Sequence, residues 1–255
     1  MNRNISYLVK KFSFLLLPWV AFSLSACHSD NEAQKIIDQS IAAHGGALFQ
    51  QAKISFDFRD RHYEIFKSPD RFRYVRSFSD ESGKVVDVLD NEGFERKVDG
   101  NPVGLTEKDE NAYSNSVNSV AYFAFLPYGL NDAAVIKQYL GETKLEGEEY
   151  HLIKVTFEQE GGGEDHEDEF LYWINKQDYK MDYLAYTYHT DGGGIRFRKA
   201  INTHDVSGIL LQDYDNYKPE DERLPVESMQ ELFESGELEL LSKILLENIE
   251  VELIQ

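Results

Sequence analysis

The sequence predicts an α+β domain that is mainly antiparallel β, with a curled meander sheet forming a half-open barrel under two or three covering helices. Short segments of alternating apolar and polar residues, separated by Gly-, Asn- and Asp-containing turns, predict the strands. Only three segments have the apolar spacing of a helix. A sheet of roughly ten strands is too large to stay flat, so we expect it to curl, with the helices covering its concave face.

The N-terminal segment has the parts of a bacterial export signal. A basic start is followed by an apolar run over 12–24, which is shorter than the roughly 20 residues that a membrane-spanning helix needs. Leu24-Ser25-Ala26-Cys27 then forms a lipobox. We therefore expect residues 1–26 to be removed, and Cys27 to become the first residue of a lipoprotein that acyl chains such as palmitate hold in the membrane.

Charge and cysteine content restrict the partners of the mature chain. Cys27 is the single cysteine, so its acylation leaves no thiol for a disulfide, a metal site or a nucleophile. Removing Arg3, Lys10 and Lys11 with the signal leaves 23 basic and 46 acidic side chains, a formal charge of −23. Such an acidic surface argues against nucleic acid as a partner and against flat binding to an anionic lipid surface.

A short acidic tether over 27–32 precedes a single domain over 33–255. The first helix is expected from about Glu32 to Ala43. Asn31 suits its N-terminus, and Gly45-Gly46 punctuates its end. Ala33, Ile36, Ile37 and Ile41 share one face of this helix and predict its buried side.

A second helix is expected over 107–126, and strands surround it. Thr106 and Asp109 resemble a capping box at its start. Two-residue alternation predicts the strands, and Gly236 closes a short third helix near 226–234. The predicted strands begin near 53, 72 and 139, and continue at 151–158, 168–175, 180–189, 195–203, 209–217 and 249–253.

The C-terminal end of the second helix is apolar on every side. A helix end of this kind is buried or contacts another apolar group. We therefore name four aromatic residues as the candidate lining of a ligand cavity, with simple filling of the core as the equal alternative. These residues are Tyr122, Phe123, Phe125 and Tyr128.

Two triple-glycine loops form a second candidate site. If the strands at 150–203 are antiparallel in sequence order, loops 159–167 and 190–194 lie at one end of the sheet. The resulting polar rim could hold a cation, a polar head group or a substrate, or it could be two solvated loops. Its candidate residues are Glu164, Asp165, His166, His189, Asp191 and Arg196.

No established catalytic motif is present. The sequence contains no G-x-S-x-G elbow, P-loop or H-E-x-x-H zinc motif. The seven histidines are scattered rather than spaced as a ligand set. We therefore predict no metal site and no cofactor, and leave enzymatic activity as an alternative without assigned catalytic residues.

Several stretches resemble a family of uncharacterised Bacteroidota lipoproteins defined only as a domain of unknown function. They are AAHGGALF (42–49), ISFDFRDRHYEI (54–65), YSNSVNSVAYFAFLPYGLND (113–132), QEGGGEDHEDEFLYWIN (159–175) and YLAYTYHTDGGGIRFR (183–198). The order of helix, AHGG turn and strand meander also resembles the LolA/LolB-like lipoprotein-carrier fold. That resemblance implies a half-barrel with an apolar concavity capped by helices, and it assigns no residue roles.

Together these features predict a lipid-anchored envelope protein that binds an apolar or amphipathic ligand, such as an acyl chain or lipid, in a half-barrel cavity. An enzyme acting at the polar rim and a cell-surface scaffold or adhesion component remain alternatives. His28 follows the cysteine, and the acidic segment after it resembles Bacteroidota export tags. We therefore expect the outer membrane, with surface exposure as a further alternative.

Overall fold

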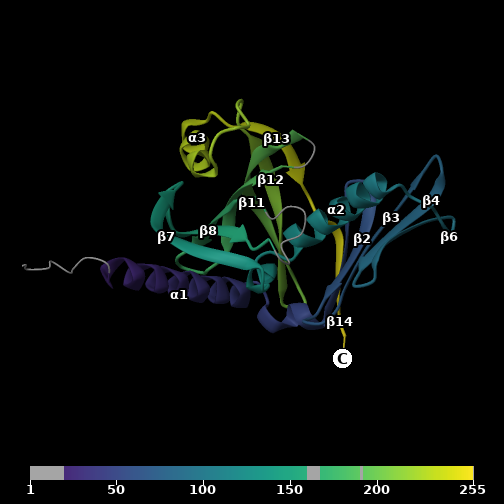
Figure 1. Ribbon diagram of the computed structural model, residues 1–255, viewed down its shortest axis with the longest axis horizontal. Coiled ribbons are helices and arrows are strands. Elements are labelled where there is room, and N and C mark those ends of the chain that lie inside the picture. The colour runs from purple at the N-terminus through teal and green to yellow at the C-terminus, as the bar shows by residue number, and fades with distance from the viewer. Residues whose placement is uncertain (1–19, 160–166, 190–191, 255) are drawn as a thin grey trace, which may run out of the picture.

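The computed structural model describes residues 20–159, 167–189 and 192–254, with side chains from residue 31 onward. In these residues, fourteen strands form two seven-stranded antiparallel sheets, A and B (Figure 1). The predicted class, mainly antiparallel β with a few helices, is confirmed. The strands divide between two sheets rather than forming one curled sheet, and within the described ranges these sheets do not close into a barrel.

Sheet A contains the first six strands and the last one. Its order is β14-β1-β2-β3-β4-β5-β6, so β1 to β6 form a simple meander and the C-terminal strand adds at the β1 edge. The strands are β1 (Ala52–Phe58), β2 (Arg61–Lys67), β3 (Phe72–Asp80), β4 (Gly83–Asp90), β5 (Gly93–Val98), β6 (Asn101–Pro102) and β14 (Glu247–Leu253).

Sheet B is a second meander, with the order β13-β12-β11-β10-β9-β8-β7. Its strands β9 and β10 are buried on both faces, because helices cover both sides of this sheet. The strands are β7 (Val135–Leu145), β8 (Glu148–Phe157), β9 (Phe170–Asn175), β10 (Met181–Tyr188), β11 (Gly194–Val206), β12 (Ile209–Lys218) and β13 (Glu239–Ile244).

The C-terminal hairpin joins the two sheets. Strand β13 pairs with β12 in sheet B, and β14, which follows after Leu245 and Leu246, pairs with β1 in sheet A. Asp213 holds the crossing point, because its Oδ1 accepts a hydrogen bond of 2.8 Å from the Leu246 amide. The edges of both sheets therefore meet, and an interior forms between them.

Three helices cover the sheets. Helix α1 (Val20–Ala43) packs beside β7 on one face of sheet B, and α3 (Met229–Ser235) covers the opposite face (Figure 1). Helix α2 (Glu107–Ala124) crosses the face of sheet A that looks toward sheet B. Short 3-10 turns extend these helices at Gly46–Gln51, Tyr128–Asn131 and Val226–Ser228.

Each helix closes its own apolar core. The predicted face of α1 is confirmed, since Ala33, Ile36, Ile37 and Ile41 are buried against the inner face of sheet B. Helix α2 buries Val117, Ala121 and Phe125 against sheet A and the start of β12. The third core lies between α3 and the outer face of sheet B, around Trp173 and Phe197.

Helix α1 begins earlier than predicted. It extends from Val20 instead of starting near Glu32, so the backbone of the predicted tether 27–32 is helical. No proline or glycine lies between Val20 and Ala43 to interrupt the helix. The side chain of Cys27 is outside the described residues. None of the helices in the described part of the chain has both the length and the apolar character needed to cross a bilayer.

The turn after α1 requires glycine. Gly45 has a φ of 126°, and a Cβ at this position would lie 2.9 Å from the carbonyl oxygen of Gly208 in the β11–β12 turn. His44 reinforces the same contact, because its carbonyl accepts a hydrogen bond of 3.0 Å from the Leu210 amide. The AHGG segment therefore docks the end of α1 onto strand β12.

Candidate functional site

A cavity of about 180 Å³ lies between the sheets, enclosed by α2 and the C-terminal hairpin. We call it the inter-sheet cavity. Strand β1 forms one wall, strands β11 to β13 form the opposite wall, and α2 closes one side. The site thus combines segments from both ends of the chain, which the crossover at β13–β14 brings together.

Apolar side chains from both sheets and from α2 form most of the lining. Side chains of a strand point alternately to its two faces, so Ile54, Phe56 and Phe58 of β1 all face inward. Of these, Phe56 and Phe58 reach the cavity. Helix α2 adds apolar side chains from one face of its C-terminal half. The apolar lining consists of Phe56, Phe58, Val120, Phe123, Ala124, Ile244 and Leu246.

The sheet B wall is polar. Arg198 on β11 and Asn216 on β12 are directly paired across the two strands, and Gln212 and Tyr214 lie further along β12. Arg198 is 8% exposed and donates one hydrogen bond of 2.8 Å, from Nη2 to the Tyr186 hydroxyl. Burial raises the pKa of the Tyr214 phenol, which therefore stays neutral.

Helix α2 is held in place by its cap and by a buried ion pair. The Thr106 hydroxyl oxygen accepts a hydrogen bond of 3.2 Å from the Asp109 amide, as the predicted capping box requires. Midway along the helix, the Ser116 hydroxyl accepts a hydrogen bond of 2.8 Å from Nη1 of Arg76 on β3. Arg76 in turn donates two hydrogen bonds, of 2.9 and 2.7 Å, to Asp87 on β4.

The structure separates the four aromatic residues proposed as a cavity lining. Phe123 lines the inter-sheet cavity, and its ring lies 3.7 Å from the Arg198 guanidinium carbon. Phe125 is 2% exposed and fills the core between α2 and sheet A. Tyr128 stacks on Phe49 at 5.3 Å. Tyr122 packs on sheet B and shares a hydroxyl–hydroxyl hydrogen bond of 2.8 Å with Tyr172.

The proposed polar rim is only partly described. Glu164, Asp165, His166 and Asp191 lie outside the described residues. The strand order β8-β9-β10-β11 places the described flanks of the two rim segments at the same end of sheet B. The described flanks of the loops are joined there by a 3.0 Å hydrogen bond between His189 Nδ1 and Asp168 Oδ1.

Arg196, the remaining rim residue, is engaged in local contacts. It forms an ion pair with Glu222 and donates a hydrogen bond of 2.6 Å to the Tyr188 hydroxyl. Among the described residues, no group of three or more His, Cys, Asp or Glu side chains is arranged to hold a metal ion.

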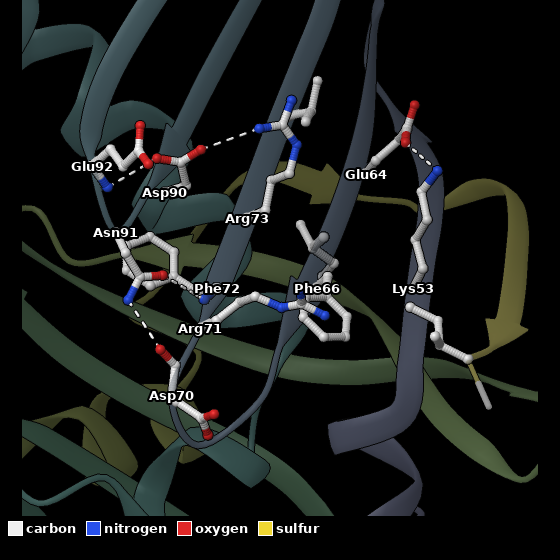
Figure 2. Close-up of a pocket in the computed structure, with 13 residues that line it drawn as sticks. Lys53, Glu64, Phe66, Asp70, Arg71, Phe72, Arg73, Asp90, Asn91 and Glu92 are labelled. Carbon is white, nitrogen blue, oxygen red and sulfur yellow. Dashed lines mark hydrogen bonds and ion pairs between the residues drawn. The ribbon is translucent and has the colours of Figure 1, made fainter.

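A larger depression of about 600 Å³ lies on the outer face of sheet A (Figure 2). It is more open than the inter-sheet cavity, and its charges are largely paired. Arg73 donates a 3.1 Å hydrogen bond to Asp90, Lys53 pairs with Glu64, and the guanidinium of Arg71 lies over the Phe66 ring (Figure 2). These mutually satisfied side chains resemble an ordinary polar sheet surface, so we take the inter-sheet cavity as the candidate site.

A buried histidine connects α1 to the cavity wall. His44 Nδ1 lies 2.8 Å from the Ser40 carbonyl oxygen, and Nε2 lies 3.4 Å from Oε1 of Gln212. Burial lowers the pKa of His44, although both hydrogen bonds act in the opposite direction. His44 is therefore held as a neutral imidazole next to a residue that lines the cavity.

Comparison with known protein families agrees with the resemblance in sequence. The model of a family of unknown function, DUF6503, matches residues 10–248. The chain belongs to this DUF6503 family. No curated protein has a matching sequence.

Solved structures with a similar fold include three bacterial proteins. A LolA superfamily protein from Nitrosomonas europaea is 11% identical, with 88% of this chain and 94% of that chain covered and a TM-score of 0.47. A DUF1329 family protein from Desulfovibrio piger is 10% identical, with 86% and 93% covered and a TM-score of 0.43. The Mycobacterium tuberculosis lipoprotein LppX is 14% identical, with 65% and 91% covered and a TM-score of 0.29. Similarities at this level do not assign a function to the DUF6503 chain.

Sequence reasoning missed the polar wall of the cavity. Arg198, Gln212 and Asn216 occupy inward positions of two predicted strands. The period of two identified these strands, but it did not reveal which of their faces is interior. An available signal was the presence of polar side chains at alternate positions in strands that are otherwise apolar.

Proposed function

We propose that this DUF6503 chain is a lipid-anchored envelope protein that binds an amphipathic ligand with an apolar chain in the inter-sheet cavity. The observation that carries the proposal is the cavity itself. It is a partly open cavity bordered by two sheets and a helix, and side chains such as Phe56, Phe123 and Leu246 line it. Cavities with mostly apolar walls and a few placed polar groups are typical of small-molecule binding sites.

The volume of the cavity restricts the ligand. About 180 Å³ is less than the roughly 300–1,000 Å³ of sites for drug-sized molecules. A single apolar chain therefore fits better than a multi-chain lipid. We expect α2 to move outward as a longer chain enters, because this helix borders the cavity without pairing in either sheet, whereas the strands of the C-terminal hairpin are hydrogen-bonded into the sheets.

Binding can be tested with a fluorescent fatty acid and with native mass spectrometry of the chain purified without detergent. We expect saturable uptake of the fatty acid, and a co-purified species of one lipid mass. Phe123→Ala should weaken uptake, whereas Phe66→Ala, which alters the outer depression, should not. Equal effects of both variants, or no uptake by the unaltered chain, would contradict the proposed function.

The lipid anchor requires a separate test. If Cys27 is acylated after removal of 1–26, Cys27→Ser should abolish incorporation of a labelled fatty acid and release the protein from membranes. Labelling that persists in this variant would overturn the anchor. Protease added to whole cells then distinguishes the two faces of the outer membrane, because only a surface-exposed domain would be digested.

A further inference from the structure

The strongest unexplained feature of the inter-sheet cavity is the Arg198 guanidinium. This side chain lines the cavity and is 92% buried, given its 8% exposure. Its Nε is buried and has no hydrogen-bond partner. The Tyr186 hydroxyl accepts one hydrogen bond from Nη2, and the Phe123 ring covers one side of the guanidinium at 3.7 Å.

In the part of the chain that the structure describes, no carboxylate neutralises this cation: the partners of the guanidinium there are the Tyr186 and Phe123 side chains. Arginine stays protonated in proteins, and a buried charge is costly unless it is paired and hydrogen-bonded. A tyrosine hydroxyl and an aromatic ring lower that cost, but neither carries a negative charge. The buried guanidinium therefore lacks a counter-ion among the residues that the structure describes.

The surroundings of Arg198 divide the cavity into two ends. Asn216 lies directly opposite Arg198 on β12, and its amide donates a 3.3 Å hydrogen bond to Ser242 on β13. The Asn216 Oδ1 has no partner, so this end contains unsatisfied polar groups as well as the charge. The other surfaces of the cavity, from β1 and α2, are mostly apolar; their polar side chains are Ser119 and Arg59, and Arg59, which follows β1, is exposed. A ligand that satisfies both ends has a charged head and an apolar tail.

We propose that Arg198 binds the anionic head group of a single-chain amphipath, a carboxylate or a phosphate, with the chain lying against Phe58, Val120 and Leu246. This inference rests on the proposed function and adds the chemistry of the ligand to it. The planar fork of a guanidinium matches the paired oxygens of either group, and charge-assisted hydrogen bonds of this kind are the stronger ones. The cation–π contact with Phe123 fixes the plane of the fork.

The test compares ligands that share a chain and differ in the head group. Dodecanoate, dodecyl phosphate and dodecanol are titrated into the full chain, and the affinities are compared. We expect at least one anion to bind roughly tenfold or more tightly than dodecanol, because hydrogen bonds to a charged group are stronger than neutral ones. The ratio of the affinities for dodecanoate and dodecyl phosphate shows whether the site prefers a fatty-acid carboxylate or a phosphate head group.

Two variants test the role of Arg198 in that preference. Arg198→Met should reduce the ratio of anion to alcohol affinity to about one. Asn216→Asp places a carboxylate directly across the strands from Arg198 and should reduce the ratio in the same way by supplying an internal counter-ion. This second variant should not lower the melting temperature, so it separates loss of recognition from loss of folding. Asn101→Asp, at the far edge of sheet A, is the matched charge control.

The outcomes distinguish the inference from the proposed function. Equal affinity for the anions and for dodecanol, or a preference that survives in both variants, overturns the role of Arg198 and leaves the binding function standing. If neither the anions nor dodecanol bind, both proposals fail. A preference that Arg198→Met and Asn216→Asp abolish, and that Asn101→Asp retains, supports the assignment.

Discussion

Arg76 and Arg198 are both buried arginines on inward-facing strand positions, yet their surroundings differ. Arg76 is 1% exposed and forms an ion pair with Asp87, which also binds Arg96. The described partners of Arg198 are the hydroxyl and ring of Tyr186 and the ring of Phe123. A buried cation that is fully paired holds a structure together, whereas one without a counter-ion retains binding capacity for an external anion.

Helix α2 contacts both arginines. Ser116, in its middle, accepts a hydrogen bond from Arg76, and Phe123, near its end, packs against Arg198. The same helix is therefore fixed to sheet A at one point and borders the cavity at the other, where the proposed function expects it to move. Variants along this helix and at the two arginines can test that division.

The largest effect is expected at the paired arginine. Arg76→Met removes three hydrogen bonds of a buried guanidinium, two of them to the Asp87 carboxylate that Arg96 then holds alone, and should lower the free energy of unfolding by about 3–5 kcal/mol. Arg198→Met removes a cation that has no counter-ion and should change this free energy by about 1 kcal/mol or less. Urea unfolding of both variants provides the comparison. Equal losses would mean that Arg198 is a structural residue like Arg76.

Two phenylalanines of the α2 segment should separate stability from binding. Phe125→Ala creates a hole in a closed core and should cost about 3–5 kcal/mol of stability. Phe123 already borders a cavity, so Phe123→Ala should cost less stability and more affinity for a fluorescent fatty acid. Both properties are measured on the same protein preparations. A larger loss of affinity in Phe125→Ala, at equal stability, would contradict this assignment.

A smaller effect is expected where Arg76 holds α2. Ser116→Ala removes the acceptor of one Arg76 hydrogen bond and should lower stability by about 1 kcal/mol. If α2 moves during uptake, the same change should accelerate ligand binding measured by stopped-flow fluorescence. Ser114→Ala on the same helix is the control, because Ser114 does not line the cavity and Ser116, not Ser114, accepts the hydrogen bond from Arg76. Equal rates in both variants would count against a moving helix.

The smallest effect concerns His44 and pH. Burial lowers its pKa below the ordinary value of about 6.5, so the unfolded chain binds this proton more readily than the folded chain does. The stability contribution of neutral His44 is therefore present above pH 6.5 and is lost as the pH falls toward the folded pKa. Unfolding free energies at pH 7.5 and 5.5 should differ less in His44→Gln than in the unaltered chain. If the two free energies differ by the same amount in His44→Gln and in the unaltered chain, His44 is not the source of the pH dependence.

Local patterns in the sequence predicted most of the fold. The two-residue alternation found most of the strands, although not β13. Thr106 with Asp109 marked the start of α2, because a helix cap depends on neighbours three residues apart. The apolar face of α1 was also visible, since a helix places residues three and four apart on one side. Division of the strands into two sheets was not visible, because it depends on the long-range pairing of β14 with β1.

The sequence by itself thus determined the elements, the acidic charge, the single cysteine and the apolar character of the segment around Phe123 and Phe125. It could not show that Phe125 fills a core whereas Phe123 borders the cavity. That difference depends on the position of sheet B relative to the helix. Only the tertiary structure placed Arg198 in the wall of the cavity, with no carboxylate partner in the described ranges. Burial and pairing are properties of residues distant in the chain, and they arise only when β12, β13 and β14 join the two sheets.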